Sequence, residues 1–275
     1  MNASTEAANR LTYGSYLHVP ELLSLQRELS HPAHHDELLF IVSHQVYELW
    51  FKQLLHEVGA VCEWLDRDEP LRAAQLFDRM HAILHLLIEQ IPLLETMFAV
   101  DFAQFRDHLR PASGFQSVQF RRLEFLCGAK NPRLIDRVGE DEASRRELAE
   151  ALAQPTLYDH FLRHLARAGF AIPAAVLERD VSLPHQADEG VVDALVRLYQ
   201  HADRYYPQFR LAEHLLQWDE SFAIWRFHHV KMVERMIGSR AGTGGSSGAK
   251  YLASTLGTRF FPEIWLVRDR LTSNY

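Results

Sequence analysis

The feature that most constrains the fold is a set of long segments whose apolar residues recur every three to four positions. The longest cover residues 35–65, 70–98 and 206–237. This period forms one apolar face of an α-helix, whereas the two-residue alternation of β-strands is scarce along the chain. The sequence therefore predicts an all-α fold, a helical bundle with long core helices and smaller helices packed outside it.

Shorter helices are expected at 21–29, 115–127, 141–153, 156–168, 189–204 and 262–272. Loops are expected at 111–114, 128–132, 180–188 and 238–248, of which the last is rich in glycine and serine. No break is long enough to be a flexible linker. With 275 residues available to bury a core, we expect one domain over residues 1–275.

Composition narrows the class of partner. The formal net charge is −7, and a nucleic-acid or anionic-membrane binder would need a basic excess. No apolar run approaches the roughly 20 residues that cross a bilayer, and the first ten residues do not look like a targeting signal. The two cysteines, Cys62 and Cys127, are too few for a disulfide scaffold. We expect a cytoplasmic protein with reduced thiols and with neither a nucleic-acid nor a membrane partner.

Histidine is unusually frequent, with 16 copies, and two of them interrupt apolar helix faces. At about 100° per residue, His229 is the one polar member of a stripe formed by Leu211, Leu215, Trp218, Phe222, Trp225, Val233 and Met236. His44 interrupts a similar face formed by Phe40, Phe51, Leu55, Val58 and Cys62. Burying a lone imidazole costs free energy unless it is hydrogen-bonded or liganded. Two such helices face to face would suit a haem with one axial ligand and one distal group.

The same spacing also permits a simpler interpretation. A histidine on an apolar face is more often a core residue bonded to a neighbouring carbonyl, and periodicity cannot choose among the candidates. Four further histidines lie at comparable spacing: His81, His85, His160 and His164. The sequence contains neither an HExxH zinc-peptidase motif nor a CxxC pair.

Two further features suggest contacts with a polar ligand. Arg106 follows an aromatic-rich segment, and an arginine at such a helix end can bind a carboxylate bidentately, although most arginines only cap helices or face solvent. The segment GTGGSSG at 242–248 lacks the Gly-Lys-Ser/Thr ending of a phosphate loop. It is either a flexible surface linker or a loop whose backbone N–H groups and Thr243 hydroxyl close over a ligand.

Five blocks together resemble a known family. They are LTYGSYL at 11–17, DELLFIVSHQVYELWFKQ at 36–53, PASGFQS at 111–117, WRFHH at 225–229 and GTGGSSG at 242–248. In this order, and over residues 11 to 271, the chain is similar to the tryptophan 2,3-dioxygenases. The resemblance implies an all-α homotetramer that uses haem b with ferrous iron. It also implies an activity, the opening of the indole ring of L-tryptophan by O2 to give N-formyl-L-kynurenine, the first step of tryptophan catabolism by the kynurenine pathway.

The resemblance also implies roles for individual residues. His229 matches the axial ligand of the haem iron, and His44 matches the distal histidine that hydrogen-bonds the indole N–H. Arg106 matches the partner of the substrate carboxylate, and Thr243 matches the loop residue at the substrate's ammonium and carboxylate.

The remaining matches concern the wall of the substrate pocket. Phe40 and the segment Ile41, Val42 and Ser43 match that wall. Phe102 stands where some members of the family have a tyrosine, so this chain lacks one hydroxyl near the carboxylate. Tyr13, Tyr16 and Leu17 match an N-terminal segment, within residues 1–20, that reaches into the pocket of a neighbouring subunit.

Three other readings stay open from the sequence. A haem sensor or carrier would share His229 but would make no special demand for Arg106 or Thr243. A helical scaffold with only structural histidines would be colourless when purified. A ring-opening enzyme would act on another indole, such as a substituted tryptophan, if Phe102 and the edges of the pocket shift its preference.

Overall fold

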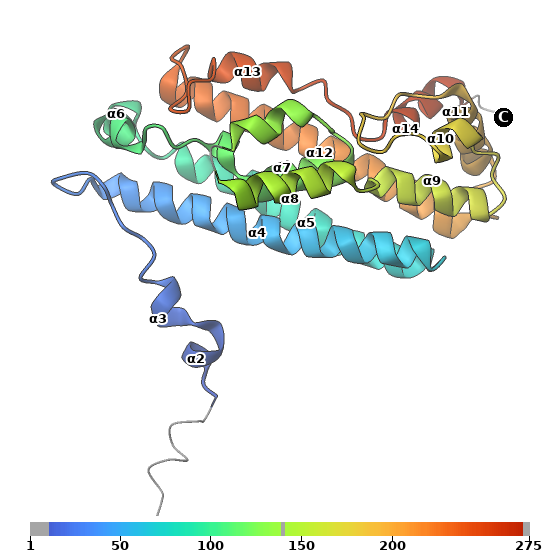
Figure 1. Ribbon diagram of the computed structural model, residues 1–275, viewed down its shortest axis with the longest axis horizontal. Coiled ribbons are helices and arrows are strands. Elements are labelled where there is room, and N and C mark those ends of the chain that lie inside the picture. The colour runs from blue at the N-terminus through green and yellow to red at the C-terminus, as the bar shows by residue number, and fades with distance from the viewer. Residues whose placement is uncertain (1–10, 139–140, 272–275) are drawn as a thin grey trace, which may run out of the picture.

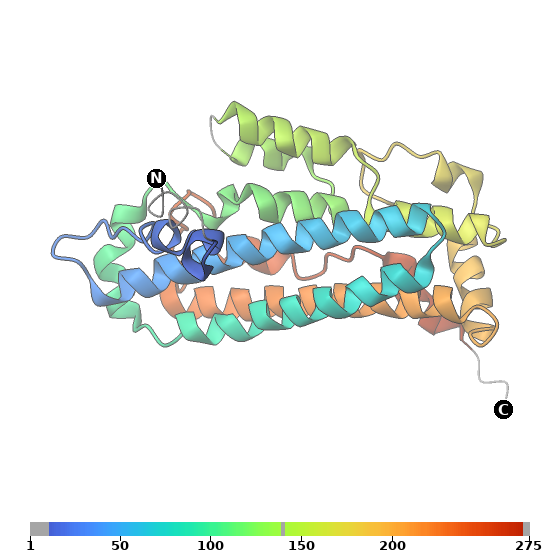
Figure 2. The same cartoon turned by 90° about the horizontal axis from the view of Figure 1, so that it is seen from below.

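The computed structural model describes residues 11–138 and 141–271, and three long helices form its centre. These are α4 (His35–Asp66), α5 (Pro70–Leu94) and α12 (Tyr206–Ile237), which run side by side along the long axis (Figures 1 and 2). Pro70 begins α5, where a missing N–H costs nothing, and Gly238, with a φ of 59°, ends α12. The predicted core of long helices is confirmed.

The faces that these helices turn toward one another form the main hydrophobic core. Its fully buried members include Leu54 and Val61 of α4, Phe77 and Leu84 of α5, and Trp218 and Phe222 of α12. Burying one large apolar side chain contributes about 1.5–3 kcal/mol, so this shared face stabilises the bundle strongly.

Shorter helices cover the core. They are α6 (Ala99–Arg106), α7 (Val118–Cys127), α8 (Glu142–Ala153), α9 (Leu157–Arg167), α10 (Ala174–Leu177), α11 (Glu189–Gln200), α13 (Ala249–Ser254) and α14 (Pro262–Leu266). Helices α7 and α9 pack against α4, α8 packs on α7, and α13 packs on α12 (Figure 1). The described ranges contain no β-strand, which confirms the all-α class.

One predicted helix, residues 21–29, is wrong. The chain instead forms α2 (Tyr13–Leu17) and α3 (Val19–Leu22), which project from the body of the bundle, and then runs without helix to residue 34 (Figure 1). The carboxylate of Glu37 accepts the backbone N–H groups of Leu29 and Ser30, which draws them away from helical bonding. The apolar side chains of this segment, such as Leu23, stay exposed, so no packed face stabilises a helix there.

Several boundaries differ from those expected. The segment 70–98 is not one helix, because residues 95–98 turn and Phe98 is extended before α6 begins. Helix α7 begins at Val118 because the Ser117 side chain caps it by accepting the Phe120 N–H. Helix α11 ends at Gln200, and α14 gives way to a short 3-10 turn at Val267–Arg270. Helix α13 was not expected.

Within the described ranges, no single helix is long and apolar enough to span a membrane. One pair bent by 93°, Pro70–Leu94 with Ala99–Leu109, meets the criteria of length and composition when taken together.

The single domain expected over residues 1–275 stays a prediction. The buried apolar side chains of the described residues form one large cluster and a smaller one that includes Phe125, Leu134 and Leu148.

Candidate functional site

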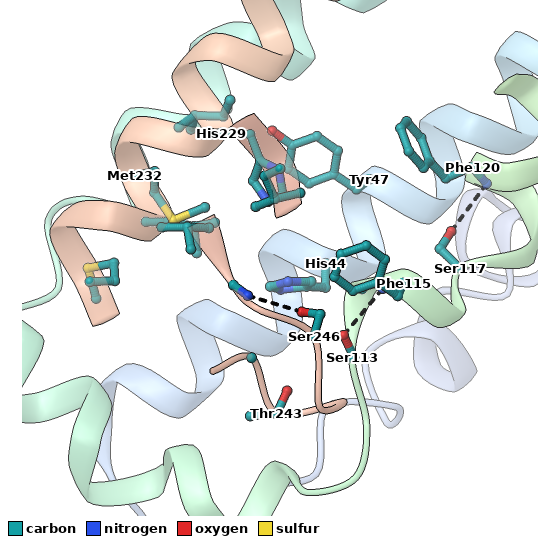
Figure 3. Close-up of a pocket in the computed structure, with 18 of the residues that line it drawn as sticks. His44, Tyr47, Ser113, Phe115, Ser117, Phe120, His229, Met232, Thr243 and Ser246 are labelled. Atoms are coloured by element: carbon teal, nitrogen blue, oxygen red, sulfur yellow. Dashed lines mark hydrogen bonds between the residues drawn. The ribbon is translucent and has the colours of Figure 1, made fainter. Parts of the chain in front are cut away.

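A cavity of about 270 Å³ lies at one end of the bundle, between α4, α5, α6, α7, α12 and the 242–248 loop. Figure 3 shows some of the side chains around it, among them His44 and His229. Most of its wall is apolar or aromatic, including Phe40, Phe51, Phe102, Phe115, Phe120, Trp225, Met232 and Met236. A concave and mainly apolar wall is typical of a site for a small organic molecule or cofactor.

His229 projects into this cavity from α12. Its ring stacks on Trp225, with the centroids 5.2 Å apart and the planes 18° apart. Burial lowers the pKa of His229 to about 4, and the neighbouring His44 and Arg121 act in the same direction. The imidazole is therefore neutral at pH 7. No described residue hydrogen-bonds its ring nitrogens, so one lone pair is available to a ligand.

His44 enters the same cavity from α4. Its Nδ1 lies 2.7 Å from the carbonyl oxygen of Phe40, one turn earlier in the helix. A carbonyl can only accept, so Nδ1 carries the proton and donates it. Burial lowers the pKa of His44, against the opposing effects of that hydrogen bond and of Glu48. In the neutral ring, Nε2 is then an acceptor, suited to an N–H donor in the cavity.

Arg106 and Thr243 also line the cavity. Arg106 ends α6, is 7% exposed, and donates from Nη2 to the carbonyl of Ala241. Burial and the nearby Arg110 and Arg240 lower its pKa, although Asp107 opposes them. Among the described carboxylates none forms an ion pair with Arg106. This guanidinium can therefore take an anionic group from a ligand.

The 242–248 loop is held in place by close backbone approaches. Thr243 Oγ1 donates to the carbonyl of Ala112 at 2.6 Å, which joins this loop to the 111–117 segment. A Cβ at Gly244 would lie 2.6 Å from the Ser113 Cβ, and one at Gly248 would lie 2.5 Å from the Arg240 carbonyl. Figure 3 shows Thr243 and Ser246 on this loop beside Ser113. The missing Cβ atoms of these two glycines therefore let the loop pack closely against Ser113 and Arg240.

The pocket-wall residues separate into two groups. Phe40 and Phe102 line the cavity, with ring centroids 5.7 Å apart. Ile41, Val42 and Ser43 do not line it, because a helix turns their side chains to other faces. Ser43 is buried and its carbonyl accepts from Gln90 at 2.8 Å.

Tyr13, Tyr16 and Leu17 lie on α2, outside the cavity, and all three are strongly exposed. Figure 1 shows α2 standing away from the bundle. Their contact with a neighbouring subunit stays a prediction, as does the wall role of Ile41, Val42 and Ser43.

The other candidate histidines have partners elsewhere. His81 Nε2 lies 3.2 Å from His214 Nδ1. His160 and His164 pair with Asp66 and Asp68, at 2.8 and 2.9 Å. Helical spacing singled out six histidines, of which His85 is exposed. Of the other five, only His44 and His229 line the cavity.

Sequence reasoning missed a buried group of charges in the cavity wall. Arg121 and Glu124 of α7 form an ion pair, and Arg226 of α12 lies 3.3 Å from Glu124. All three are at least nine-tenths buried. Their spacing within α7 resembles that of an ordinary surface pair, and Arg226 is 102 residues away, so no local signal marked them.

Comparison with known proteins shows the family of the chain. The sequence profile of the family "Tryptophan 2,3-dioxygenase" matches residues 2–168 and 140–271. A curated tryptophan 2,3-dioxygenase of Xanthomonas campestris pv. campestris (strain B100) is 45% identical over 264 residues, 96% of this chain and 89% of that protein. One from Kineococcus radiotolerans is 44% identical over 269 residues, 98% of this chain and 94% of that protein. The chain therefore belongs to the tryptophan 2,3-dioxygenase family.

Proposed function

We propose that this chain is a haem-dependent dioxygenase that opens the indole ring of L-tryptophan with O2, giving N-formyl-L-kynurenine for the kynurenine pathway. One observation carries the proposal. Two neutral histidines on different helices, His44 and His229, line one mainly apolar cavity that Arg106 and Thr243 also line. This combination suits a flat cofactor together with an aromatic substrate that bears a charged end.

The residues present fit haem b. A neutral imidazole with a free ring nitrogen is the ligand that haem iron takes, and His229 offers one within an apolar wall. When bound, the ferrous haem supplies the binding and activation of O2. Phe51, Phe120 and Trp225 provide flat apolar surface around it.

The charged end of L-tryptophan is assigned to Arg106 and Thr243. The guanidinium of Arg106 can donate two hydrogen bonds to the carboxylate in a fixed plane. The Thr243 hydroxyl donates to Ala112, which leaves its oxygen free to accept from the substrate ammonium. Phe102 lacks the hydroxyl that a tyrosine would bring, so binding of the carboxylate depends more on Arg106 and on the 242–248 loop.

The indole N–H is assigned to His44. Its Nε2 is the acceptor because Nδ1 donates to Phe40. An indole N–H is a very weak acid, so we assign His44 to orientation of the ring and not to obligatory proton removal. Fixing that orientation decides which ring carbons meet the oxygen.

The 242–248 loop is proposed to close over the bound substrate and exclude water. The loop is already hydrogen-bonded to the segments beside it. Thr243 donates to Ala112, and Ala241, just before the loop, accepts from Arg106 of α6. Substrate held by Arg106 and Thr243 would reinforce these links. Tryptophan should therefore slow proteolysis of the loop.

We propose a homotetramer in the cytoplasm, with no nucleic-acid or membrane partner. The exposed aromatic residues of α2, Tyr13 and Tyr16, support a subunit contact at the N-terminal segment. Sedimentation of the full chain tests the assembly.

The role of His44 is tested with His44→Ala, by measuring L-tryptophan affinity and turnover in the haem-loaded enzyme. We expect weaker binding and residual turnover. The wild-type enzyme with 1-methyltryptophan, which lacks the N–H, serves as the matched control and should lose similar affinity. Normal affinity combined with complete loss of turnover would show that His44 does more than orient the ring.

A further inference from the structure

The proposed function leaves unused the buried charges on α7 and α12. Arg121, Glu124 and Arg226 all line the cavity, and their exposed fractions are 7%, 7% and 4%. Glu124 is shared, with Oε2 accepting from Arg121 and Oε1 accepting from Arg226 at 3.3 Å. Two guanidinium groups and one carboxylate leave a net positive charge in the cavity wall.

Arg226 has other partners that account for it. Its Nη1 donates to the carbonyl of Thr258 at 3.2 Å. Asp219 also interacts with it electrostatically, although the carboxylate of Asp219 accepts from Phe260 and Trp265 and does not line the cavity. Arg226 is thus held by groups outside the cavity.

Arg121 lacks such support. Its single ion pair is with the shared Glu124, and its buried Nε has no hydrogen-bond partner among the described residues. The aromatic rings of Phe115 and Phe120 lie 5.5 and 5.1 Å from the guanidinium carbon. Burying an N–H group without a hydrogen-bond partner costs free energy. The guanidinium that carries this N–H is therefore suited to bind an anion.

We propose that Arg121 is a second carboxylate-binding point in the cavity, separate from Arg106. The two arginines come from different elements and have different neighbours: Arg106 faces Ala241, whereas Arg121 faces Glu124 and Phe115. The inference rests on the proposed function, which brings three carboxylates to this cavity, two from haem b and one from L-tryptophan.

The position of Arg121 favours a haem carboxylate as the group that it binds. The Arg121 guanidinium carbon lies 5.1 Å from the centre of the Phe120 ring, that ring lies 5.2 Å from the ring of Trp225, and Trp225 stacks on His229, the proposed iron ligand. Arg106, at the loop, is left for the substrate. The experiment below separates the two sources.

The test compares haem with its dimethyl ester, which lacks both free carboxylates, in titrations of the apoprotein followed by absorbance. Wild-type protein should bind haem more tightly than the ester. Arg121→Gln should lose about tenfold or more of its affinity for haem and little for the ester, because a hydrogen bond to a charged group is lost. Arg121→Lys, which keeps the charge, should recover part of the difference.

Arg122→Gln is the matched control, because Arg122 is the next residue in α7 and pairs with Glu147 at 3.1 Å outside the cavity. It should bind both compounds as wild type does. Glu124→Gln removes the competing carboxylate and should strengthen haem binding. Thermal melts of each apoprotein show whether the variants are folded.

The substrate arm titrates haem-loaded wild type and Arg121→Gln with L-tryptophan and with tryptamine, which lacks the carboxylate. A loss confined to L-tryptophan would support the carboxylate site but assign it to the substrate. The inference is overturned if folded Arg121→Gln prefers haem over its ester, and L-tryptophan over tryptamine, by the same factors as wild type. Wild-type protein that binds neither haem nor its ester would instead refute the proposed function.

Discussion

The substitution Gly248→Ala tests how the 242–248 loop is held against the cavity. Gly248 has a φ of 61° and a ψ of −130°, a conformation that residues with a Cβ rarely adopt, and such strain costs about 1–3 kcal/mol. The new Cβ would also lie 2.5 Å from the backbone carbonyl oxygen of Arg240, which cannot move without moving the loop.

This cost should appear in the loop and not in the core, because Gly248 lies outside the hydrophobic cluster. Destabilising the closed loop by about 1–3 kcal/mol raises its open population about 5- to 150-fold. Trypsin provides the assay, since Arg240 and Lys250 are exposed cleavage sites on either side of the loop. Cleavage there should accelerate by that factor, the melting temperature should change little, and the KM for L-tryptophan should rise.

Gly257→Ala is the matched control, because no atom lies within 4 Å of its added Cβ and its φ is not positive. It should be cleaved as slowly as wild type. Equal cleavage rates in Gly248→Ala, Gly257→Ala and wild type would refute the account of the loop.

Three further predictions concern single side chains. His229→Ala should abolish axial ligation and its haem absorbance bands, and unchanged bands would move the ligand to another histidine. Arg106→Leu should raise the KM for L-tryptophan at least about tenfold through loss of a charge-assisted hydrogen bond, with haem content intact, and a haem-free product would contradict this assignment. Burial, together with His214, lowers the pKa of His81 from 6.5 to about 4, so the folded state favours the neutral ring. Stability should therefore fall as the pH drops from 6.5 toward 4, and less so in His81→Gln; equal slopes of melting temperature against pH would count against it.

The long helices were predictable because their apolar period is sustained over many turns. The same period singled out His44 and His229 as candidates, and the resemblance of the sequence blocks to the family implied their roles. Periodicity alone could not separate them from His81, because the difference lies in tertiary contacts. His81 lies beside His214 on a facing helix, whereas His229 lines the cavity.

Other features depend on contacts that a local pattern does not reveal. The segment 21–29 has enough leucine to suggest a helix, yet Glu37 accepts the N–H groups of Leu29, at its end, and of the next residue, Ser30, and nothing in the described chain covers its apolar side chains. The buried charges of Arg121 and Glu124 resemble a surface pair in sequence, and only the fold adds Arg226 to them.

The most direct test of the proposed function uses the haem-reconstituted, reduced protein, mixed with L-tryptophan without oxygen and then exposed to ¹⁸O2. We predict that tryptophan shifts the haem absorbance bands and that the product is N-formylkynurenine with both added oxygen atoms labelled. Haem bands indifferent to tryptophan, with no labelled product, would contradict the proposal and favour a haem carrier.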